Sequence, residues 1–377
     1  MRIAIDASAA LNQSAGIGRY ARALIPTLAH GMPEATLSAI VAPDPAADPV
    51  VRSIGRSTLE DAGISIRTLP FSRRRADQLW FRARAPLPIE IATGKVDLVY
   101  SPDFTAPPSL SKRRVITVHD LAFEITPEHA PAGLRGYLQS VVPQQVRAAT
   151  RINAVSENTK RDLIERYRVH PERISIVPNG VDQRFFGARP LAPADRAELG
   201  IPPDYLLTVG TLEPRKNHLG IFRALEYAAS ARNLMLVVAG MRGWADDEIV
   251  DALHGLERSG RAIWLEYVPE EYLPSLYAGA AATIYTSWYE GFGLPALEAL
   301  AAGSPLVVSK APSLIEIADG VACFADAADP ASIGAAIDFA VAENRGEHDV
   351  ERRKERARRY SWASAGEALI RSIRALQ

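Results

Sequence analysis

Two glutamates eight positions apart, Glu290 and Glu298, border the segment of this chain whose residue types are best suited to bind a ligand. Between them lie Gly291, Phe292, Gly293, Leu294 and Pro295. Proline favours the first position of a helix, whose free backbone N–H groups can bind a diphosphate, and the glycines allow close approach of the backbone. Because carboxylates repel phosphates, we expect Glu290, and Glu298 in the first helical turn, to accept hydrogen bonds from hydroxyls on either side of the diphosphate.

A molecule with hydroxyls on both sides of a diphosphate is a nucleotide sugar, so this segment predicts a nucleotide-sugar site. The structural alternative is that the Gly-x-Gly sequence is a plain turn and that Glu298 only favours the helix dipole. The combination of paired carboxylates, glycines and a helix start favours the binding site.

A second candidate segment, residues 205–218, has the pattern of a strand, a glycine turn at Gly210, a loop and a helix that begins near Asn217. Arg215 and Lys216 would then lie at a helix N-terminus, at the carboxyl edge of a strand. Two cations beside free backbone N–H groups can clamp a diphosphate. The alternative is that both are solvated surface cations.

Other positions carry weaker signals. Gly240 follows a strand pattern, where the turn alone explains a glycine equally well, and the backbone near Val268 could contact a nucleotide base. His119 stands at the end of a buried strand pattern. It is either a structural residue or a proton donor or acceptor to a reacting sugar. Gly16 and Gly18 open the first helix and could bring backbone N–H groups near a phosphate. They also match a dinucleotide-binding fingerprint. That fingerprint directly follows its strand, whereas about nine residues separate these glycines from the preceding strand.

Short apolar runs alternate with amphipathic helical patterns along the whole chain, which is typical of parallel sheets covered by helices on both faces. The runs form two series, at residues 3–5, 37–41, 98–100, 115–118 and 152–155, and at 205–209, 235–239, 263–265, 282–285 and 305–308. The fold class predicted is α/β, with two doubly wound, Rossmann-like domains that face each other across a cleft. We expect an N-terminal domain at 1–185, a linker at 186–204, a donor-binding domain at 205–360, and a C-terminal helix at 361–377 that packs back on the first domain.

Composition narrows the functional class. Hydrophobic residues make up 47% and charged residues 23% of the 377 residues, and the net charge of −1 gives no reason to expect a nucleic-acid partner. Residues 1–185 contain 24 Lys and Arg against 18 Asp and Glu, so the first half is the basic one. We expect Cys323 to be buried and inert, and we expect a cytoplasmic protein without signal peptide or membrane-spanning segment. Because no Asp-x-Asp motif or His/Cys cluster is present, we expect no metal and no other cofactor.

One basic segment suggests a surface partner. Residues 67–84 interleave six arginines with Phe71, Leu79, Trp80 and Phe81, and such a stretch can lie on an anionic membrane surface. The protein would then be peripheral on the inner face of the cell membrane. The alternative is a solvated basic face with its aromatic rings in the core.

Taken together, these residues resemble the retaining glycosyltransferases of family 4, which have the two-domain GT-B fold, and the resemblance covers essentially the whole chain. Beyond the paired glutamates, the matching segments are residues 117–120, 154–158, 177–182 and 210–217. The detail is most similar to bacterial mannosyltransferases that assemble polysaccharide on lipid carriers. The resemblance implies a nucleotide-sugar donor, with GDP-mannose first and UDP-glucose, UDP-GlcNAc and dTDP-sugars open, and a saccharide acceptor that is lipid-linked.

The resemblance also implies roles for single residues. Glu290 would hold hydroxyls of the donor sugar, and Glu298 the ribose. Lys216 and Arg215 would neutralise the departing diphosphate, and His119 would approach the sugar near its anomeric carbon. Gly16 and Gly18 would border the diphosphate and the acceptor.

Two positions depart from the family pattern. Thr211 stands where many relatives have Arg, so Arg215 would supply that charge or the phosphate clamp would be weaker. Glu266 stands where a glycine is common, which leaves the identity of the base open. The rival hypotheses are a nucleotide-sugar epimerase of the same fold, a non-catalytic nucleotide-sugar-binding relative and, more distantly, a dinucleotide oxidoreductase.

Overall fold

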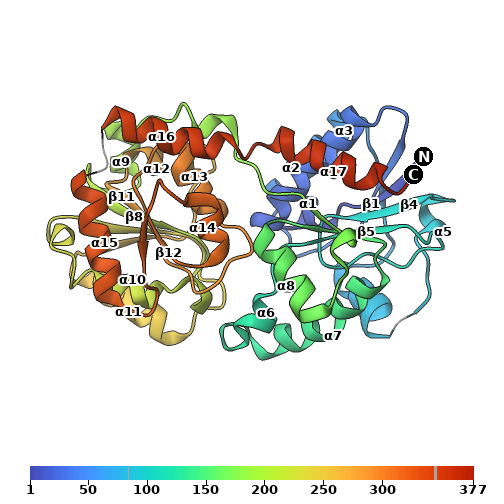
Figure 1. The fold of residues 1–377 in the computed structure, drawn as a ribbon, viewed down its shortest axis with the longest axis horizontal. Helices are drawn as coiled ribbons and strands as arrows, with labels where there is room; N and C mark the ends of the chain where they lie inside the picture. The colour runs from blue at the N-terminus through green and yellow to red at the C-terminus, as the bar shows by residue number, and fades with distance from the viewer. Residues whose placement is uncertain (84, 344–345) are drawn as a thin grey trace. The chain divides into compact units, whose positions relative to one another are not determined.

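The computed structural model describes residues 1–83, 85–343 and 346–377 of the protein. The described chain forms two compact units (Figure 1). Unit 1 comprises residues 1–121, 136–180 and 362–377, and unit 2 comprises residues 122–135 and 181–361. Among the described residues, no helix is long and apolar enough to cross a membrane.

Unit 1 is built on a parallel sheet whose order, over the described residues, is β3-β2-β1-β4-β5-β6-β7. The strands are β1 (Arg2–Asp6), β2 (Thr36–Val41), β3 (Ser65–Thr68), β4 (Leu98–Ser101), β5 (Arg114–Val118), β6 (Arg151–Ala154) and β7 (Ile174–Ile176). Ile3 on the central strand lies opposite both Leu37 and Leu98, so apolar side chains from three strands form the middle of the core. The carboxyl ends of β1, β4 and β5 meet at one edge of this sheet, and His119 follows β5 there.

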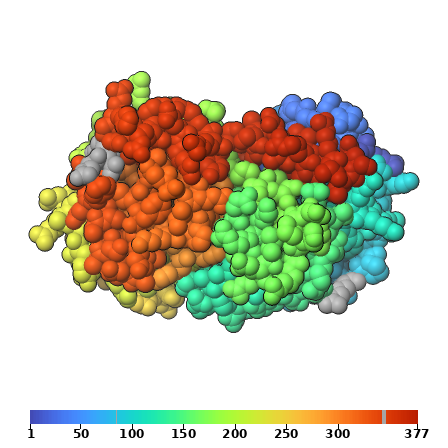
Figure 2. Space-filling model, in the orientation of Figure 1, coloured from blue at the N-terminus to red at the C-terminus, as the bar shows by residue number. Residues whose placement is uncertain are grey.

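Helices cover the sheet of unit 1. They are α1 (Ser8–Asn12), α2 (Gly16–Gly31), α3 (Pro49–Asp61), α4 (Arg73–Ala76), the π-helix η1 (Asp77–Arg82), α5 (Glu90–Thr93), α7 (Ala132–Ala148), α8 (Glu157–Tyr167), η3 (Pro171–Arg173) and α17 (Trp362–Arg374). Helix α7 belongs to unit 1 from Gly136 onward. The C-terminal helix α17 lies beside α2, and Figure 2 shows its red atoms on the surface of unit 1. It buries Leu369 and Ile373, and Oγ of Ser372 donates to Oδ1 of Asn153 at 2.6 Å. The last helix is therefore part of the first unit.

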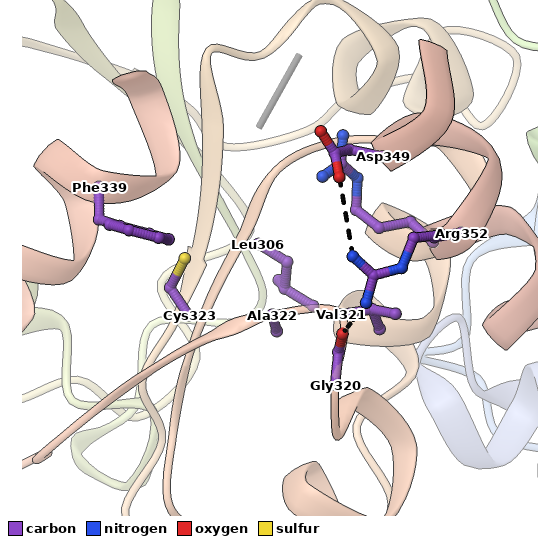
Figure 3. Close-up of a pocket in the computed structure, with 9 residues that line it drawn as sticks. Leu306, Gly320, Val321, Ala322, Cys323, Phe339, Asp349 and Arg352 are labelled. Atoms are coloured by element: carbon purple, nitrogen blue, oxygen red, sulfur yellow. Dashed lines mark hydrogen bonds and ion pairs between the residues drawn. The ribbon is translucent and has the colours of Figure 1, made fainter. Parts of the chain in front are cut away.

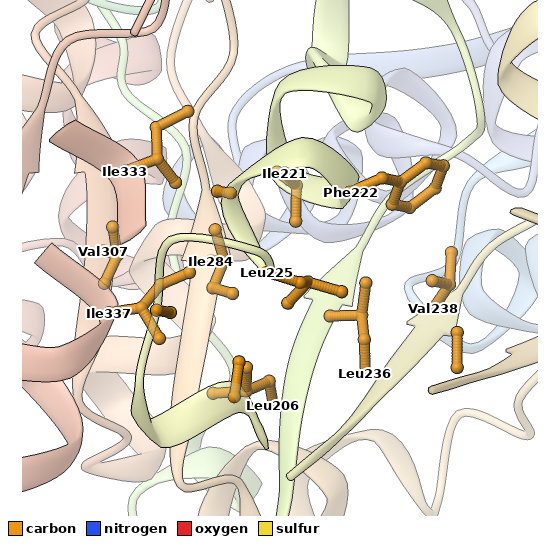
Figure 4. Packing of buried hydrophobic residues seen from close by; sticks show 14 of the residues in the cluster. Leu206, Ile221, Phe222, Leu225, Leu236, Val238, Ile284, Val307, Ile333 and Ile337 are labelled. Carbon is orange, nitrogen blue, oxygen red and sulfur yellow. The ribbon is translucent and has the colours of Figure 1, made fainter. Parts of the chain in front are cut away.

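Unit 2 is built on a second parallel sheet, whose order over the described part of the chain is β10-β9-β8-β11-β12-β13. Its strands are β8 (Tyr205–Val209), β9 (Met235–Ala239), β10 (Ala262–Leu265), β11 (Ala282–Tyr285), β12 (Leu306–Ser309) and β13 (Cys323–Ala325). One face packs on α10 (His218–Ala224), α11 (Asp247–Arg258) and α15 (Pro330–Glu343), and Leu253 of α11 belongs to this core. Figure 4 shows Leu206, Ile221 and Ile337 in the same cluster. This dry core fixes the positions of the strand ends that carry the candidate residues.

The remaining helices of unit 2 cover both faces of its sheet and form its turns. They are α6 (Ala122–Ile125), η2 (Pro127–His129), η4 (Gln183–Phe185), α9 (Pro193–Glu198), η5 (Pro214–Lys216), α10 (His218–Ala224), η6 (Ser230–Arg232), α11 (Asp247–Arg258), α12 (Leu273–Gly279), α13 (Leu294–Ala302), α14 (Pro312–Ala318), α15 (Pro330–Glu343) and α16 (Glu347–Arg358). Residues 186–204, expected to be a linker, lie within unit 2. Leu191 is buried there, and Nζ of Lys354 donates to the carbonyl of Phe186 at 2.9 Å.

The α/β fold class with two parallel-sheet units is confirmed. Three strands were not predicted: β3, β7 and β13, which all lie at sheet edges. They are three or four residues long and only partly buried, so they lack the apolar run by which the inner strands are recognised. Cys323, on β13, is only partly buried, which corrects the expectation that it is buried.

Candidate functional site

The candidate residues of unit 2 gather on the loops that follow β8, β9 and β11, at the carboxyl edge of the sheet. The first two loops pack closely: the N–H of Gly210 donates to the carbonyl of Ala239 at 2.9 Å. Gly240 has φ of 155°, and a Cβ there would lie 2.1 Å from the carbonyl oxygen of Gly210. Gly210 itself has φ of 147°. Glycine is therefore required at Gly240 by the fold itself, before any ligand is considered.

Glu290 is the centre of a buried charge cluster. Nζ of Lys216 lies 2.6 Å from its Oε1, and Nη1 of Arg215 lies 2.8 Å from its Oε2. Arg215 also contacts Oε1 of Glu213 at 2.5 Å. The hydroxyl of Tyr285 accepts from Lys216 at 2.5 Å and donates to Glu290 at 2.8 Å. Two cations and two carboxylates thus compensate each other beside one tyrosine.

The cluster determines the protonation of its members. Burial alone would raise the pKa of Glu290, but the charges and hydrogen bonds of Arg215 and Lys216 outweigh it and lower the pKa to about 2. Burial, reinforced by the Glu290 charge, raises the pKa of Tyr285 far above its ordinary value of 10.0. At neutral pH, Glu290 is therefore a carboxylate and Tyr285 a neutral phenol.

Local backbone geometry holds this cluster in place. Asn217, directly after Lys216, adopts a left-handed conformation with φ of 59°. Its amide donates to the carbonyls of Thr286 at 3.2 Å and Ala327 at 2.8 Å. The hydroxyl of Ser313 donates to the carbonyl of Glu290 at 2.7 Å. These contacts tie the loop of Lys216 to the loop of Glu290 across the sheet edge.

Glu298 lies deeper than expected. Helix α13 begins at Leu294, so Glu298 is its fifth residue and lies beyond the first turn, which corrects the sequence-based position. The helix starts one residue earlier because Gly293 caps it with φ of 112°. Glu298 is 1% exposed, and its Oε2 accepts from the hydroxyl of Tyr277 at 3.1 Å.

The glycine segment before α13 has structural requirements of its own. A Cβ at Gly293 would lie 2.5 Å from Cδ2 of Leu314. The ring of Phe292 is buried and meets the ring of Tyr360 edge to face, with 5.6 Å between centroids. Gly291 follows Glu290 in the loop, and Leu294 is partly buried as the first helical residue. Phe292 is therefore a packing residue, with little surface left for a ligand.

His119, Gly16 and Gly18 lie in unit 1. Nε2 of His119 lies 2.8 Å from the carbonyl oxygen of Pro102, and rings of Tyr20 and Phe104 meet it edge to face. Because a carbonyl only accepts, Nε2 carries the proton. Burial lowers the pKa of His119 below 6.5, so the ring is neutral at neutral pH and Nδ1 has a lone pair.

The two glycines of unit 1 belong to helix α2, where Gly16 is the first residue. A Cβ at Gly18 would lie 1.8 Å from the carbonyl oxygen of Gln13, which also accepts from Nη1 of Arg22 at 2.8 Å. Close packing against this loop requires glycine at position 18. In unit 2, Val268 lies in the loop that follows β10 and is partly buried.

The structure thus brings together Arg215, Lys216 and Glu290, with Gly210 and Gly240 forming the adjacent turns. Sequence reasoning missed Glu213 and Tyr285 as members of this cluster. Tyr285 could have been noticed, because it ends a strand pattern five residues before Glu290. Glu213 lies next to the cations in sequence, but its pairing depends on the course of the loop.

The basic segment of unit 1 turns partly inward. Arg73 is paired with Asp77 at 3.3 Å and with Asp103 at 3.8 Å. Trp80 is buried, and its ring meets Phe71 edge to face at 5.4 Å between centroids. Arg67, Arg74, Arg75 and Arg82 are exposed. Residue 84 lies outside the described residues. Trp80 is therefore not on the surface that this segment offers to a partner, and Arg73 is largely taken up by its two carboxylates.

A cavity of about 240 Å³ lies elsewhere in unit 2 (Figure 3). Leu306 and Cys323, the first residues of β12 and β13, line it together with Phe339 and Arg352. Because these residues begin their strands, the cavity lies at the amino edge of the sheet, opposite the edge that carries Glu290. Arg352 donates to the carbonyl of Gly320 at 2.8 Å and contacts Asp349 at 3.8 Å.

Comparisons with known proteins match both halves of the chain. The family model "Glycosyltransferase Family 4" matches residues 15–185, and the model "Glycosyl transferases group 1" matches residues 192–360. The chain belongs to the family 4 glycosyltransferases.

Among similar proteins, the O-antigen chain mannosyltransferase B of Escherichia coli is 33% identical over 64% of this chain and 64% of its own length. The serotype-specific mannosyltransferase WbdA of Escherichia coli is 31% identical over 47% of this chain and 22% of its own length. The match therefore spans less than two thirds of either relative. HepE of Anabaena, solved with UDP and glucose, shares the fold with a TM-score of 0.73 at 19% identity, over 100% of both chains.

Proposed function

We propose that the protein is a retaining, metal-independent glycosyltransferase that moves mannose from GDP-mannose to a saccharide acceptor, which is lipid-linked, in polysaccharide biosynthesis. The observation that carries the proposal is the charge cluster around Glu290 at the carboxyl edge of the second sheet, where open α/β folds bind ligands. The similarity to O-antigen mannosyltransferases supports the sugar, and through it the nucleotide.

The cluster suits a donor with a diphosphate beside a sugar. An ammonium has three N–H donors. Among the described residues, Lys216 donates to Tyr285 and to Glu290, so its third N–H is left for a phosphate oxygen. Charge held in place before the reaction stabilises a departing diphosphate without reorganisation. Glu290, fully ionised, accepts hydrogen bonds from sugar hydroxyls. By resemblance, Glu298 takes the ribose and the turns at Gly210, Gly240 and Gly291 border the donor.

Retention of anomeric configuration is proposed from the family resemblance, and the low pKa of Glu290 is consistent with it. A carboxylate whose pKa is about 2 takes up no proton at neutral pH, so Glu290 is not the general base. The bond between the anomeric carbon and the phosphate oxygen breaks, and the acceptor oxygen bonds to that carbon on the same face. The leaving phosphate takes the acceptor's proton and departs as the nucleoside diphosphate. By resemblance, neutral His119 accepts a hydrogen bond at Nδ1 from a hydroxyl of the sugar.

A lipid-linked acceptor is supported by a surface of unit 1. Ile91 is 78% and Leu110 is 77% exposed, and the carboxylate of Glu90 joins their segments by accepting from the N–H of Leu110 at 3.0 Å. Exposed Lys112 and Arg113 lie two and three positions after Leu110. Aliphatic side chains flanked by cations fit an anionic membrane surface. This surface adds to the exposed arginines of residues 67–82.

A donor screen tests the proposal. GDP-, UDP-, dTDP- and ADP-sugars are added in the presence of EDTA, and the melting temperature is recorded. We expect GDP-mannose to give the largest increase, because a ligand that binds only the folded state stabilises it. Transfer to added oligosaccharides is then followed by nuclear magnetic resonance, which reports the anomeric configuration of the product.

The rival functions give different outcomes in the same screen. An epimerase would convert the donor without any acceptor, and a non-catalytic relative would show the thermal shift without turnover. A requirement for metal, or an inverted product, would contradict those parts of the proposal.

A further inference from the structure

Two tryptophans at the carboxyl edge of the second sheet are exposed beside the charge cluster. Trp288 is 40% and Trp244 is 43% exposed. Trp288 follows β11 and precedes Glu290 by two positions, and Trp244 follows β9. Large aromatic rings bury more area than most side chains, so two exposed indoles at one sheet edge indicate a binding surface.

A histidine joins the two tryptophans. The ring of His129 stacks on Trp288, with 6.1 Å between centroids and 29° between planes. Nε1 of Trp244 donates to the carbonyl of His129 at 3.3 Å. His129 ends η2, in the segment 122–135 that belongs to unit 2. We call these three residues, His129, Trp244 and Trp288, the aromatic ledge.

The ledge is continuous with the charge cluster. The N–H of Trp288 donates to the carbonyl of Arg215 at 2.9 Å, and Arg215 contacts Glu290 at 2.8 Å. The charges of Arg215 and Glu213 both act on the imidazole of His129. A molecule that contacts the ledge therefore lies next to the group that binds the donor sugar.

We propose that the aromatic ledge is the subsite for the acceptor saccharide, on which a hexopyranose ring stacks through its C–H face. The face of an indole is electron-rich and attracts the weakly positive C–H groups of a sugar ring. Trp244 and Trp288 are the exposed members of the ledge, so their rings are the parts of it that a sugar can reach.

This proposal rests on the proposed function, which sets the direction in which the donor lies along the edge of the sheet. The base-reading loop at Val268 follows β10, and β9 and β8 separate that strand from β11. Trp288 is on the β11 loop with Glu290, and so on the sugar side of the donor. The ledge carries no formal charge when His129 is neutral, and burial lowers the pKa of His129. A neutral saccharide suits it better than a phosphate.

Three variants test the ledge. Trp288→Ala removes the ring, Trp288→Phe retains an aromatic face, and Tyr227→Ala removes a 60% exposed ring of unit 2 outside the ledge. The binding of α-linked mannotriose is measured by tryptophan fluorescence and isothermal calorimetry, with GDP and without it. We expect Trp288→Ala to weaken binding about tenfold, which corresponds to about 1.4 kcal/mol, while Trp288→Phe keeps most of the affinity and Tyr227→Ala keeps all of it.

The donor-induced thermal shift is measured on the same variants. We expect it to be equal in wild type and Trp288→Ala. Three results would each overturn the ledge as an acceptor subsite. The first is equal mannotriose affinity in the two proteins, and the second is loss of the donor-induced shift in Trp288→Ala. The third is a wild type whose melting temperature rises with donor but which binds no mannotriose. Failure of the proposed function has another signature: the wild type would show no shift with any nucleotide sugar, while mannotriose binding would still report on the ledge.

Discussion

The ammonium of Lys216 lies 2.6 Å from a carboxylate oxygen of Glu290, although 74 positions separate the two residues in the chain. Their side chains are 14% and 8% exposed, so this ion pair is shielded from water. Breaking a buried pair leaves an uncompensated charge, which costs far more than losing a surface pair. Lys216 therefore keeps Glu290 ionised and places a positive charge beside it.

Removal of the cations should impair transfer. We expect Arg215→Ala and Lys216→Ala each to lower kcat by about 10²–10³-fold, because in the proposed function each removes a charge that stabilises the leaving diphosphate. Steady-state kinetics with the donor found in the screen measures the loss. Arg223→Ala is the matched control, since Arg223 pairs with Glu248 on the surface, where both side chains are more than 60% exposed. Full activity in a folded Lys216→Ala variant would contradict the catalytic role.

Glu290 should make stability depend on acid pH. Its pKa is about 2 in the folded state and 4.5 in the unfolded state, so the folded protein holds fewer protons in this range. The carboxylate stabilises the fold above pH 4.5, by about 3 kcal/mol, and this contribution is lost as the pH falls toward 2. We expect the decline in unfolding free energy between pH 5 and pH 2 to be smaller in Glu290→Gln. Denaturant melts at several pH values compare the two proteins, and parallel profiles would refute the assignment.

Transfer should also lose activity at acid pH through His119. Because burial lowers its pKa below 6.5, protonation sets in only on the acid side of that value. We expect kcat/KM to rise with pH along a limb whose midpoint lies below 6.5, and to lose this limb in His119→Asn. An unchanged profile in the variant would assign the limb to another group.

Gly240 should be required for folding more than for donor contact. A Cβ there meets the Gly210 carbonyl, and φ of 155° disfavours any side chain, so we expect Gly240→Ala to lower the unfolding free energy by about 2 kcal/mol or more. Gly255→Ala, within helix α11, is the control and should raise it by about 0.5–1 kcal/mol. Urea melts measure both. A Gly240→Ala protein as stable as wild type would show that the turn tolerates a side chain.

Membrane contact should depend on Ile91 and Leu110. We expect the double variant Ile91→Ser/Leu110→Ser to weaken binding to phosphatidylcholine vesicles with 30% phosphatidylglycerol by about tenfold or more, because two exposed aliphatic side chains that would enter the bilayer are lost. Co-sedimentation measures the bound fraction.

The controls separate this surface from the rest of unit 1. Val50→Ser/Ile54→Ser changes two aliphatic side chains that are 62% and 46% exposed, and should leave vesicle binding unchanged. Arg74→Ser/Arg75→Ser tests the basic segment without disturbing Arg73, which is partly buried and paired with Asp77. Equal binding by every variant would count against membrane contact at both places.

Much of the architecture was readable from local pattern. Inner strands such as β8 and β9 are five residues long and almost wholly apolar, which is typical of buried parallel strands. Gly240 and Gly293 stand where backbone geometry strongly favours glycine. Glu290 follows β11 at the carboxyl edge of the sheet, where open α/β folds bind ligands. Each of these signals depends on neighbours within a few positions, which is why the chain alone carries it.

The sequence by itself therefore determined the two-sheet α/β class and the loop that holds Glu290. The tertiary structure decided which side chains meet: Glu213 with Arg215, Lys216 with Glu290, and His129 with Trp288. It also turned Arg73 and Trp80 inward and placed Glu298 beyond the first helical turn. The physical reason is that such pairings depend on strand order and on the course of loops, which bring together residues far apart in the chain. A residue's type and its neighbours in sequence do not specify those distances.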